Sequence, residues 1–156
     1  MDGGSEINLN QLFKQPVYLT EDGVEHLKIE GGFLHKILWV VQTDYSIQKT
    51  FIEDFAKRVL TNSKMIRQDI GIIRIPANKK FSAFDIVKQF QPKALVVFCL
   101  NSNLTNENYS LSNVEVNTIN EVQVLFMESI LEADKKEKKI LFWNAWQKLL
   151  SSINHS

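Results

Sequence analysis

The sequence has few cysteines, prolines and glycines, the residues that cross-link a chain or interrupt its helices and strands. Its 156 residues include one cysteine, three prolines and six glycines. Cys99 alone cannot form an intrachain disulfide, and the first residues, Met1 to Ser5, show no basic segment followed by an apolar one. We therefore expect a cytoplasmic protein. A chain of this length can bury about two-thirds of its unfolded surface, so we expect a soluble globular domain that needs no disulfide or structural metal.

A net charge and a long apolar segment are also missing. Eighteen Lys and Arg residues balance eighteen Asp and Glu residues. Proteins that bind nucleic acid normally carry a basic excess or a basic stripe, so we expect no direct nucleic-acid binding. The longest apolar runs, residues 37–41 and 94–100, are much shorter than the roughly 20 residues that span a bilayer. We therefore expect no membrane insertion.

The sequence also lacks the usual signatures of a reactive site. No glycine stands in Gln42-Thr43-Asp44 or in Asn101-Ser102-Asn103, where a phosphate-binding turn would follow a strand. The three histidines lie far apart, and Cys99 lies between Phe98 and Leu100, which is typical of a buried strand residue. No Ser has the Gly-x-Ser-x-Gly spacing of a nucleophile elbow. We predict no catalytic residue, metal or cofactor.

Periodicity predicts an α/β fold. Residues 33–41, 69–75 and 94–100 are apolar strands, and their runs are continuous, as in parallel strands buried on both faces. Apolar residues recur every three to four positions from Ile47 to Leu60, which indicates an amphipathic helix between the first two strands. A second, shorter helix should begin at a capping box from Ser82 to Asp85 and end before Pro92.

The rest of the chain predicts one edge of the sheet and a final helix. Residues 101–113 are polar and indicate a long loop, after which strands at 114–118 and 122–127 should pair as an antiparallel hairpin. One helix should run from Glu132 to Ile153, with Glu132–Lys136 and Asp134–Lys138 as stabilising charge pairs. The expected architecture is a three-layer α/β sandwich with a mostly parallel central sheet, an antiparallel hairpin at one edge and a C-terminal helix.

Residues 1–24 form a separate region. The segment is polar except for one apolar cluster, which is too short to build a core, so we interpret it as an N-terminal arm joined to a single domain at residues 25–156. In the last helix, Ile140 and Trp143 widen the apolar face beyond one stripe. Trp143 therefore belongs either to a broad core face or to a partner-binding surface.

These features together resemble the psi subunit of bacterial DNA polymerase III, an accessory protein of the clamp loader. The resemblance rests on the arm sequence Leu12-Phe13-Lys14-Gln15-Pro16-Val17-Tyr18-Leu19, on the three-stranded α/β core and on the final segment from Lys138 to Trp146. It implies a non-enzymatic adaptor whose arm docks on clamp-loader subunits and whose body pairs with a chi-like subunit. The residues that gain a role as loader contacts are Leu12, Phe13, Val17, Tyr18 and Leu19.

Two alternatives remain open. The chain could be a small α/β hydrolase or a ligand-binding protein with its site at the carboxyl edge of the sheet, formed by Thr43, Asp44, Asn101 and Ser102. For Asp44 itself, the residues favour a simpler role as the cap of the helix that follows it. The other alternative is a homodimer in which Trp143 packs against its own copy across a two-fold axis.

Overall fold

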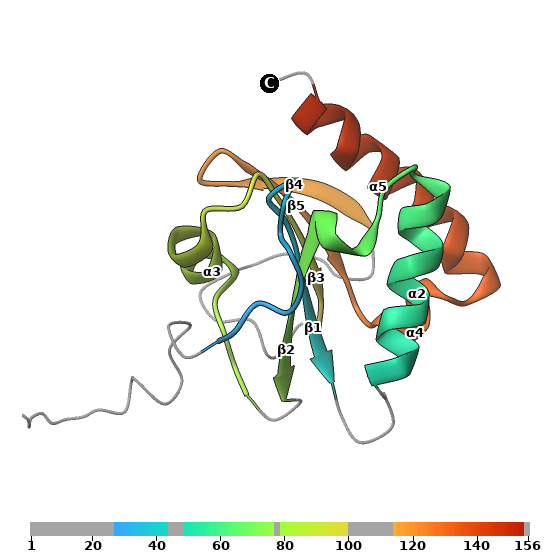
Figure 1. Ribbon diagram of the computed structural model, residues 1–156, viewed down its shortest axis with the longest axis horizontal. Helices are drawn as coiled ribbons and strands as arrows, with labels where there is room; N and C mark the ends of the chain where they lie inside the picture. The colour runs from blue at the N-terminus through green and yellow to red at the C-terminus, as the bar shows by residue number, and fades with distance from the viewer. Residues whose placement is uncertain (1–26, 44–48, 77–78, 100–113, 155–156) are drawn as a thin grey trace, which may run out of the picture.

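The computed structural model describes residues 27–43, 49–76, 79–99 and 114–154 (Figure 1). Its centre is a five-stranded sheet in the order β2-β1-β3-β5-β4. The strands are β1 (Ile37–Thr43), β2 (Ile70–Pro76), β3 (Ala94–Phe98), β4 (Glu115–Ile119) and β5 (Val122–Met127). The pairs β1–β2, β1–β3 and β3–β5 are parallel, and β4–β5 is an antiparallel hairpin at one edge. The predicted fold class is confirmed.

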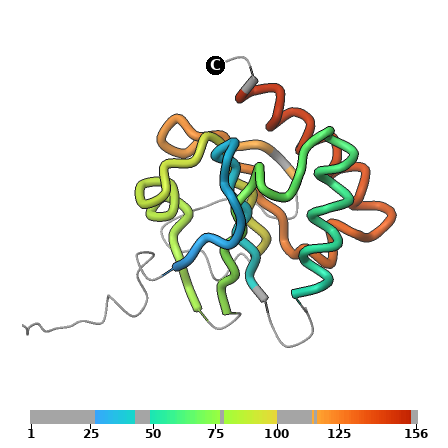
Figure 2. Tube along the Cα trace, in the orientation of Figure 1, coloured from blue at the N-terminus to red at the C-terminus, as the bar shows by residue number. Residues whose placement is uncertain are grey.

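Helices cover both faces of this sheet. They are α2 (Lys49–Asn62), α3 (Ala83–Phe90), α4 (Ile130–Ala133) and α5 (Lys136–Asn154), with a 3-10 turn, η3 (Arg67–Asp69), before β2. Figure 1 and the trace in Figure 2 show α2 and α5 side by side on one face and α3 on the other. Two buried clusters, one on each face, join these helices to the strands. The protein therefore has three layers.

Strand β1 explains why the apolar runs are continuous. Ile37, Trp39 and Val41 belong to the cluster under α2 and α5, whereas Leu38 and Val40 belong to the cluster under α3. All five are at most 1% exposed. The segment from Ile37 to Val41 is therefore covered on both faces and carries apolar side chains only, as the sequence predicts, and the first polar side chain, Gln42, donates to the Pro76 and Lys79 carbonyls.

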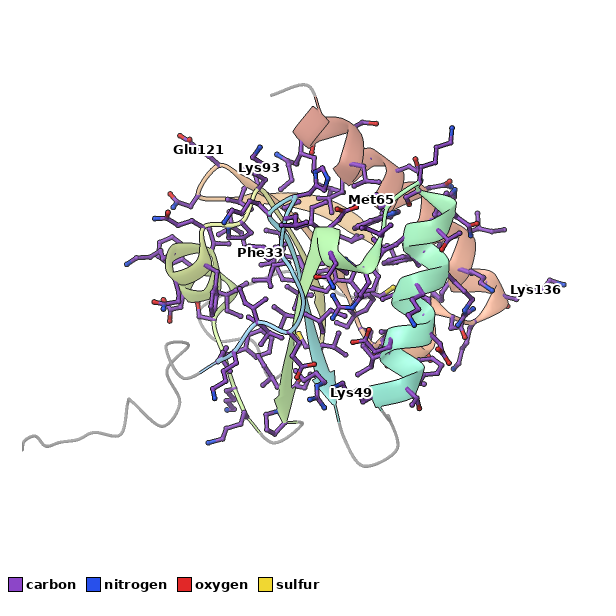
Figure 3. The ribbon with its side chains drawn as sticks, in the orientation of Figure 1. Phe33, Lys49, Met65, Lys93, Glu121 and Lys136 are labelled. Atoms are coloured by element: carbon purple, nitrogen blue, oxygen red, sulfur yellow. The ribbon has the colours of Figure 1, made fainter. Side chains whose placement is uncertain are left out.

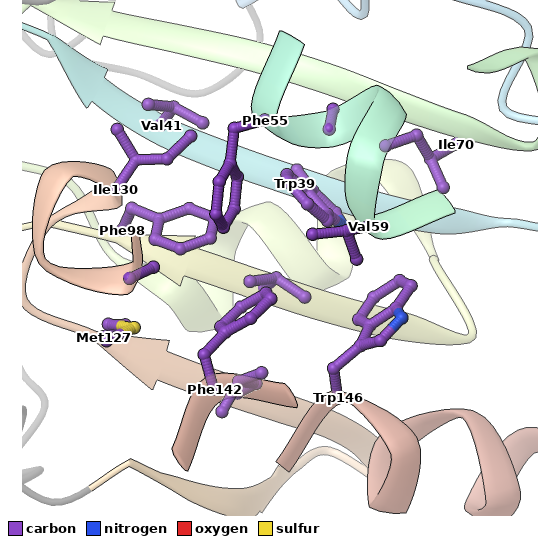
Figure 4. Packing of buried hydrophobic residues seen from close by; sticks show 14 of the residues in the cluster. Trp39, Val41, Phe55, Val59, Ile70, Phe98, Met127, Ile130, Phe142 and Trp146 are labelled. Atoms are coloured by element: carbon purple, nitrogen blue, oxygen red, sulfur yellow. The ribbon is translucent and has the colours of Figure 1, made fainter. Parts of the chain in front are cut away.

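The cluster under α2 and α5 is built from aromatic rings around Trp39 (Figure 4). The ring centroid of Trp39 lies 5.5 Å from that of Phe98 and 5.6 Å from that of Trp146. Phe55 of α2 and Phe142 of α5 lie 6.0 and 6.2 Å from Trp39. These separations are typical of favourable edge-to-face and tilted ring pairs, so the cluster binds both helices to the middle of the sheet.

Helix α3 begins and ends as the sequence predicts. The Ser82 hydroxyl accepts a 3.3 Å hydrogen bond from the Asp85 backbone N–H, which is the capping contact. Gln91 ends the helix in the left-handed region, at a φ of 48°, and its N–H donates to the Val87 carbonyl. Pro92 follows and cannot continue the helix.

Two predicted boundaries are wrong. The first strand begins at Ile37, because residues 33–36 form a turn with positive φ at Phe33 and Lys36 and their backbone bonds to residues 68–70. The third strand ends at Phe98, after which the Cys99 N–H still donates to the Met127 carbonyl at 3.0 Å. The first difference comes from a turn whose geometry depends on its backbone bonds to a distant segment.

The predicted continuous final helix is also wrong. It is interrupted between α4 and α5, and Asp134 caps the end of α4. Glu132 pairs with Lys135, and Asp134 pairs with Lys139 and with Arg58 of α2. The carboxylates therefore bind different partners from the predicted Lys136 and Lys138, because the break changes the helical spacing.

The hairpin turn yields a stability prediction. Asn120 and Glu121 link β4 to β5 with φ values of 49° and 70°, the signature of a two-residue type I′ turn. Glycine adopts this conformation without the steric cost that a side chain carries. Glu121→Gly should raise the free energy of unfolding by about 0.5–1 kcal/mol in a urea titration. Glu121→Ala removes the same carboxylate but keeps the strain, so an equal gain in that control would contradict the explanation.

Candidate protein-binding groove

A groove of about 610 Å³ runs between α2 and the first half of α5. The α2 side contributes its outward-facing residues and one core ring, and the α5 side contributes one turn of the helix. The lining residues are Phe55, Lys57, Arg58, Val59, Thr61, Asn62, Lys139, Ile140, Phe142 and Trp143. Figure 3 shows the side chains of these two helices pointing away from the sheet as well as towards it.

The base of the groove is closed by the aromatic core. Phe55 and Phe142 are each 2% exposed, and their ring centroids lie 5.6 Å apart across the gap between the helices. Trp143 is partly buried and packs against the same cluster. Ile140 is 66% exposed, far more than the core positions around it. The groove therefore offers an apolar surface whose floor is rigid and whose wall is open to solvent.

The rim of the groove is basic. Of the described residues that line it, Lys57, Arg58 and Lys139 are basic and none is acidic. The Arg58 guanidinium lies 5.6 Å from the ring centroid of Phe55 and bonds to Asp134 at 3.0 Å. Lys139 approaches the same carboxylate at 3.7 Å. This arrangement favours an apolar ligand that carries negative charge at its edges.

The α2 wall is held in place by Arg67. Its guanidinium bonds to both Glu53 carboxylate oxygens, at 2.7 and 3.1 Å, and to the backbone carbonyls of Ile70 and Glu30 at 3.0 and 3.1 Å. Gly31, at a φ of 108°, lies beside it, and a Cβ there would collide with the guanidinium. The hydrogen bond and charge of Arg67 lower the pKa of Glu53 below its ordinary value, against the opposing effect of burial.

The structure separates the predicted site residues into three groups. Trp143 lies on the groove wall, where its side chain packs partly against the core cluster and partly lines the groove. Thr43 is the last residue of β1, opposite Pro76, and only its backbone is described. The remaining predicted residues lie outside the described residues: Leu12, Phe13, Val17, Tyr18, Leu19, Asp44, Asn101 and Ser102.

The described part of the chain contains no other arrangement that indicates chemistry. No group of three or more His, Cys, Asp or Glu side chains within it could hold a metal ion. His35 lies 3.3 Å from the Asp69 carboxylate, and Cys99 is 2% exposed. None of the described helices has the length and apolar character required to cross a bilayer.

The sequence alone does not indicate the α2 half of the groove. Lys57, Arg58 and Thr61 follow an ordinary amphipathic pattern, in which polar residues occupy the outer face. Only the placement of α5 beside α2 turns this outer face into a wall. The available signal was on α5, where Ile140 and Trp143 extend the apolar stripe of Phe142 and Trp146.

No protein-family model, no curated protein and no solved structure matches this chain. The groove must therefore be interpreted from its own geometry and chemistry.

The Arg67–Glu53 pair predicts a pH dependence of stability. A carboxyl whose pKa is lowered by folding stabilises the protein above its ordinary value of 4.5, and that stabilisation is lost as the pH falls through the lowered value. Glu53→Gln should reduce the free energy of unfolding at pH 7 by about 1–3 kcal/mol. The difference from wild type should then shrink steadily in denaturant titrations below about pH 4.5.

A matched control is Glu137→Gln on the exposed first turn of α5. This substitution removes a carboxylate of the same kind, which interacts only with the N-terminal end of its helix, so it should cost about 0.3–1 kcal/mol at most, less than Glu53→Gln. If the free energy of unfolding of Glu53→Gln stays below that of wild type by the same amount down to pH 3, the Arg67–Glu53 pair does not act through the ionised carboxylate.

Proposed function

We propose that this protein is a non-enzymatic, psi-like accessory subunit of a DNA polymerase III clamp loader, with the groove between α2 and α5 as its binding site for a chi-like subunit. The observation that carries the proposal is the exposed Ile140 beside the half-buried Trp143 over a rigid aromatic floor. Interfaces gain most of their energy where aromatic and aliphatic side chains meet in a well-packed centre with a polar rim. The groove has this composition.

The support for a protein partner comes from both rigidity and charge. The groove walls are tied to the sheet by Trp39 contacts on both helices and by the Arg67 bonds to Glu53, so little ordering is required on binding. Lys57 and Lys139 at the rim can attract acidic side chains of a partner and set its orientation. A chi-like subunit with an apolar ridge flanked by acidic residues fits this surface.

In the same proposal the N-terminal arm has a different partner. Leu12, Phe13, Val17, Tyr18 and Leu19 bind clamp-loader subunits, as the resemblance to the psi family implies. Because a single chain then carries two separate contacts, it links the loader to the chi-like subunit. This role requires no cofactor and no catalysis.

The groove contact is tested by Ile140→Glu. The side chain is 66% exposed, so the substitution should not disturb the core. It places a buried charge in the complex and should weaken binding to the chi-like subunit of the same genome at least tenfold, about 1.4 kcal/mol. The measurement is titration calorimetry with purified proteins, supported by size-exclusion chromatography of the mixture.

Leu141→Glu is the matched control for this test. Leu141 is the next residue of α5, is 49% exposed and does not line the groove. It should bind like wild type. If wild type fails to bind any clamp-loader or chi-like subunit, the proposed function is wrong. If both variants bind equally well, the groove is not the contact surface.

The arm contact predicts a separable defect. The double substitution Leu12→Asp and Phe13→Asp should remove co-elution with clamp-loader subunits, because it replaces the apolar side chains of the arm by charges. It should not weaken binding to the chi-like subunit. Loss of both partners together would contradict two separate contacts.

A further inference from the structure

The zero net charge of this chain is a sum of regions that differ in sign: residues 1–26 carry −4, the described residues carry +6, and Asp44 and Glu107 account for the remaining −2. Residues 1–26 contain five acidic residues and a single basic residue, Lys14; the acidic residues are Asp2, Glu6, Glu21, Asp22 and Glu25. The described residues 27–43, 49–76, 79–99 and 114–154 contain 17 basic and 11 acidic residues. The N-terminal segment and the folded part therefore attract one another electrostatically.

The groove is where this attraction coincides with an apolar surface. Its described lining contains three basic residues and no acidic one. The arm carries Leu9, Leu12 and Phe13 in a stretch, residues 7–20, that contains Lys14 and no acidic residue, with Glu6 before it and Glu21, Asp22 and Glu25 after it. Apolar residues flanked by carboxylates are the ligand chemistry that the aromatic floor and the basic rim suit.

The arm is also long enough. Leu27, the first described residue, packs against the cluster on the α3 face, opposite the groove. Thirteen residues separate Phe13 from Leu27, and an extended chain covers about 3.3–3.6 Å per residue, so Phe13 can reach about 46–50 Å from Leu27. Half the circumference of a folded body of this size, roughly 35 Å across, is about 55 Å. The arm does not need that full path, because Glu30 pairs with Ile72 of the edge strand β2 and lies 4.0 Å from Lys49 of α2, so the chain already runs along the sheet edge beside α2. The arm of one molecule can therefore pass around the edge of the sheet to its own groove.

We propose that the acidic arm occupies the groove of its own molecule whenever no partner is bound. Leu12 and Phe13 cover Ile140 and Trp143, and the neighbouring carboxylates lie near Lys57 and Lys139. This contact goes beyond the proposed function. In the free protein the arm and the groove cover each other, so neither is fully available to a partner. A partner that enters the groove releases the arm, and a partner that binds the arm opens the groove.

A weak contact is sufficient for this role. A tethered segment meets its site at an effective concentration of about 1 mM, so an intrinsic dissociation constant of about 0.1 mM leaves the groove occupied roughly nine-tenths of the time. The apparent dissociation constant of a groove partner then rises about tenfold. Because the attraction is between exposed charges, it should weaken between 0.1 M and 1 M salt, as the screening length falls from about 10 to about 3 Å.

The test uses the full chain with a spin label on the arm. Cys99 is buried, so Asn10→Cys provides one accessible thiol for labelling. In NMR spectra, the label should broaden the indole N–H signal of Trp143 and the amide signal of Ile140 more than those of Lys64 and Lys93. Protein without the introduced cysteine, treated identically, gives the baseline. Uniform broadening over the surface, or none, would overturn the proposal.

Charge variants separate specific docking from general attraction. Lys57→Glu with Lys139→Glu should remove most of the broadening at Trp143. Lys64→Glu with Lys93→Glu makes the same change in net charge at exposed positions outside the groove lining and should keep it. Equal losses in both double variants would show that the groove is not the docking site.

A mixing experiment distinguishes the arm's own groove from that of a second copy. Isotope-labelled protein without the spin label is mixed with unlabelled protein that carries it. Docking within one molecule predicts no broadening at Trp143 in this sample. Broadening there would mean that the arm binds a second copy, which contradicts the proposal. None of these results depends on a clamp-loader subunit, so failure here leaves the proposed function intact.

Discussion

The contacts of Trp39 determine the position of every element that forms the groove. Its indole lies at 0% exposure in the middle of β1 and touches rings from β3, α2 and α5. Trp146 approaches edge-on, with an interplanar angle of 84°, and donates its own N–H to the Ser63 hydroxyl at 2.8 Å. The Trp39 N–H has no acceptor among the described residues. Packing alone holds this ring, and the hydrogen bond of Trp146 fixes its main neighbour.

The same packing explains why a groove exists. Phe55 and Phe142 meet directly above the sheet, with their rings 5.6 Å apart, so the space next to the strands is full. Farther from the sheet the two helices present Lys57, Arg58 and Ile140, which do not meet across the gap. Arg58 instead lies over Phe55 and bonds to Asp134, which ties α2 to the α4–α5 junction. The helices are thus held at a fixed separation by their inner residues, and among the groove residues Ile140 remains 66% exposed.

Much of the fold follows from local signals in the sequence. The continuous apolar strands, the Ser82 cap and the spacing of the 114–127 hairpin each depend on a few adjacent residues, and each agrees with the structure. The break in the final helix at Asp134 does not follow from local signals, because Asp134 pairs with Arg58, which lies 76 positions earlier. The groove is missed for the same reason. Ile140 and Trp143 look like a wide core stripe until the position of α2 shows which part of the stripe remains uncovered.

The distribution of charge illustrates the same limit. A net charge of zero suggests that the molecule has no concentrated electrostatic field. This holds for the whole molecule at distances well beyond the screening length of about 8 Å. Within that distance the relevant quantity is the charge of each region. The folded part has a basic excess, the groove rim is basic, and the compensating carboxylates are concentrated before Leu27. A neutral chain can therefore hold a basic, apolar binding surface, provided that the compensating acidic residues lie in another part of the chain, and such a segment is itself attracted to that surface.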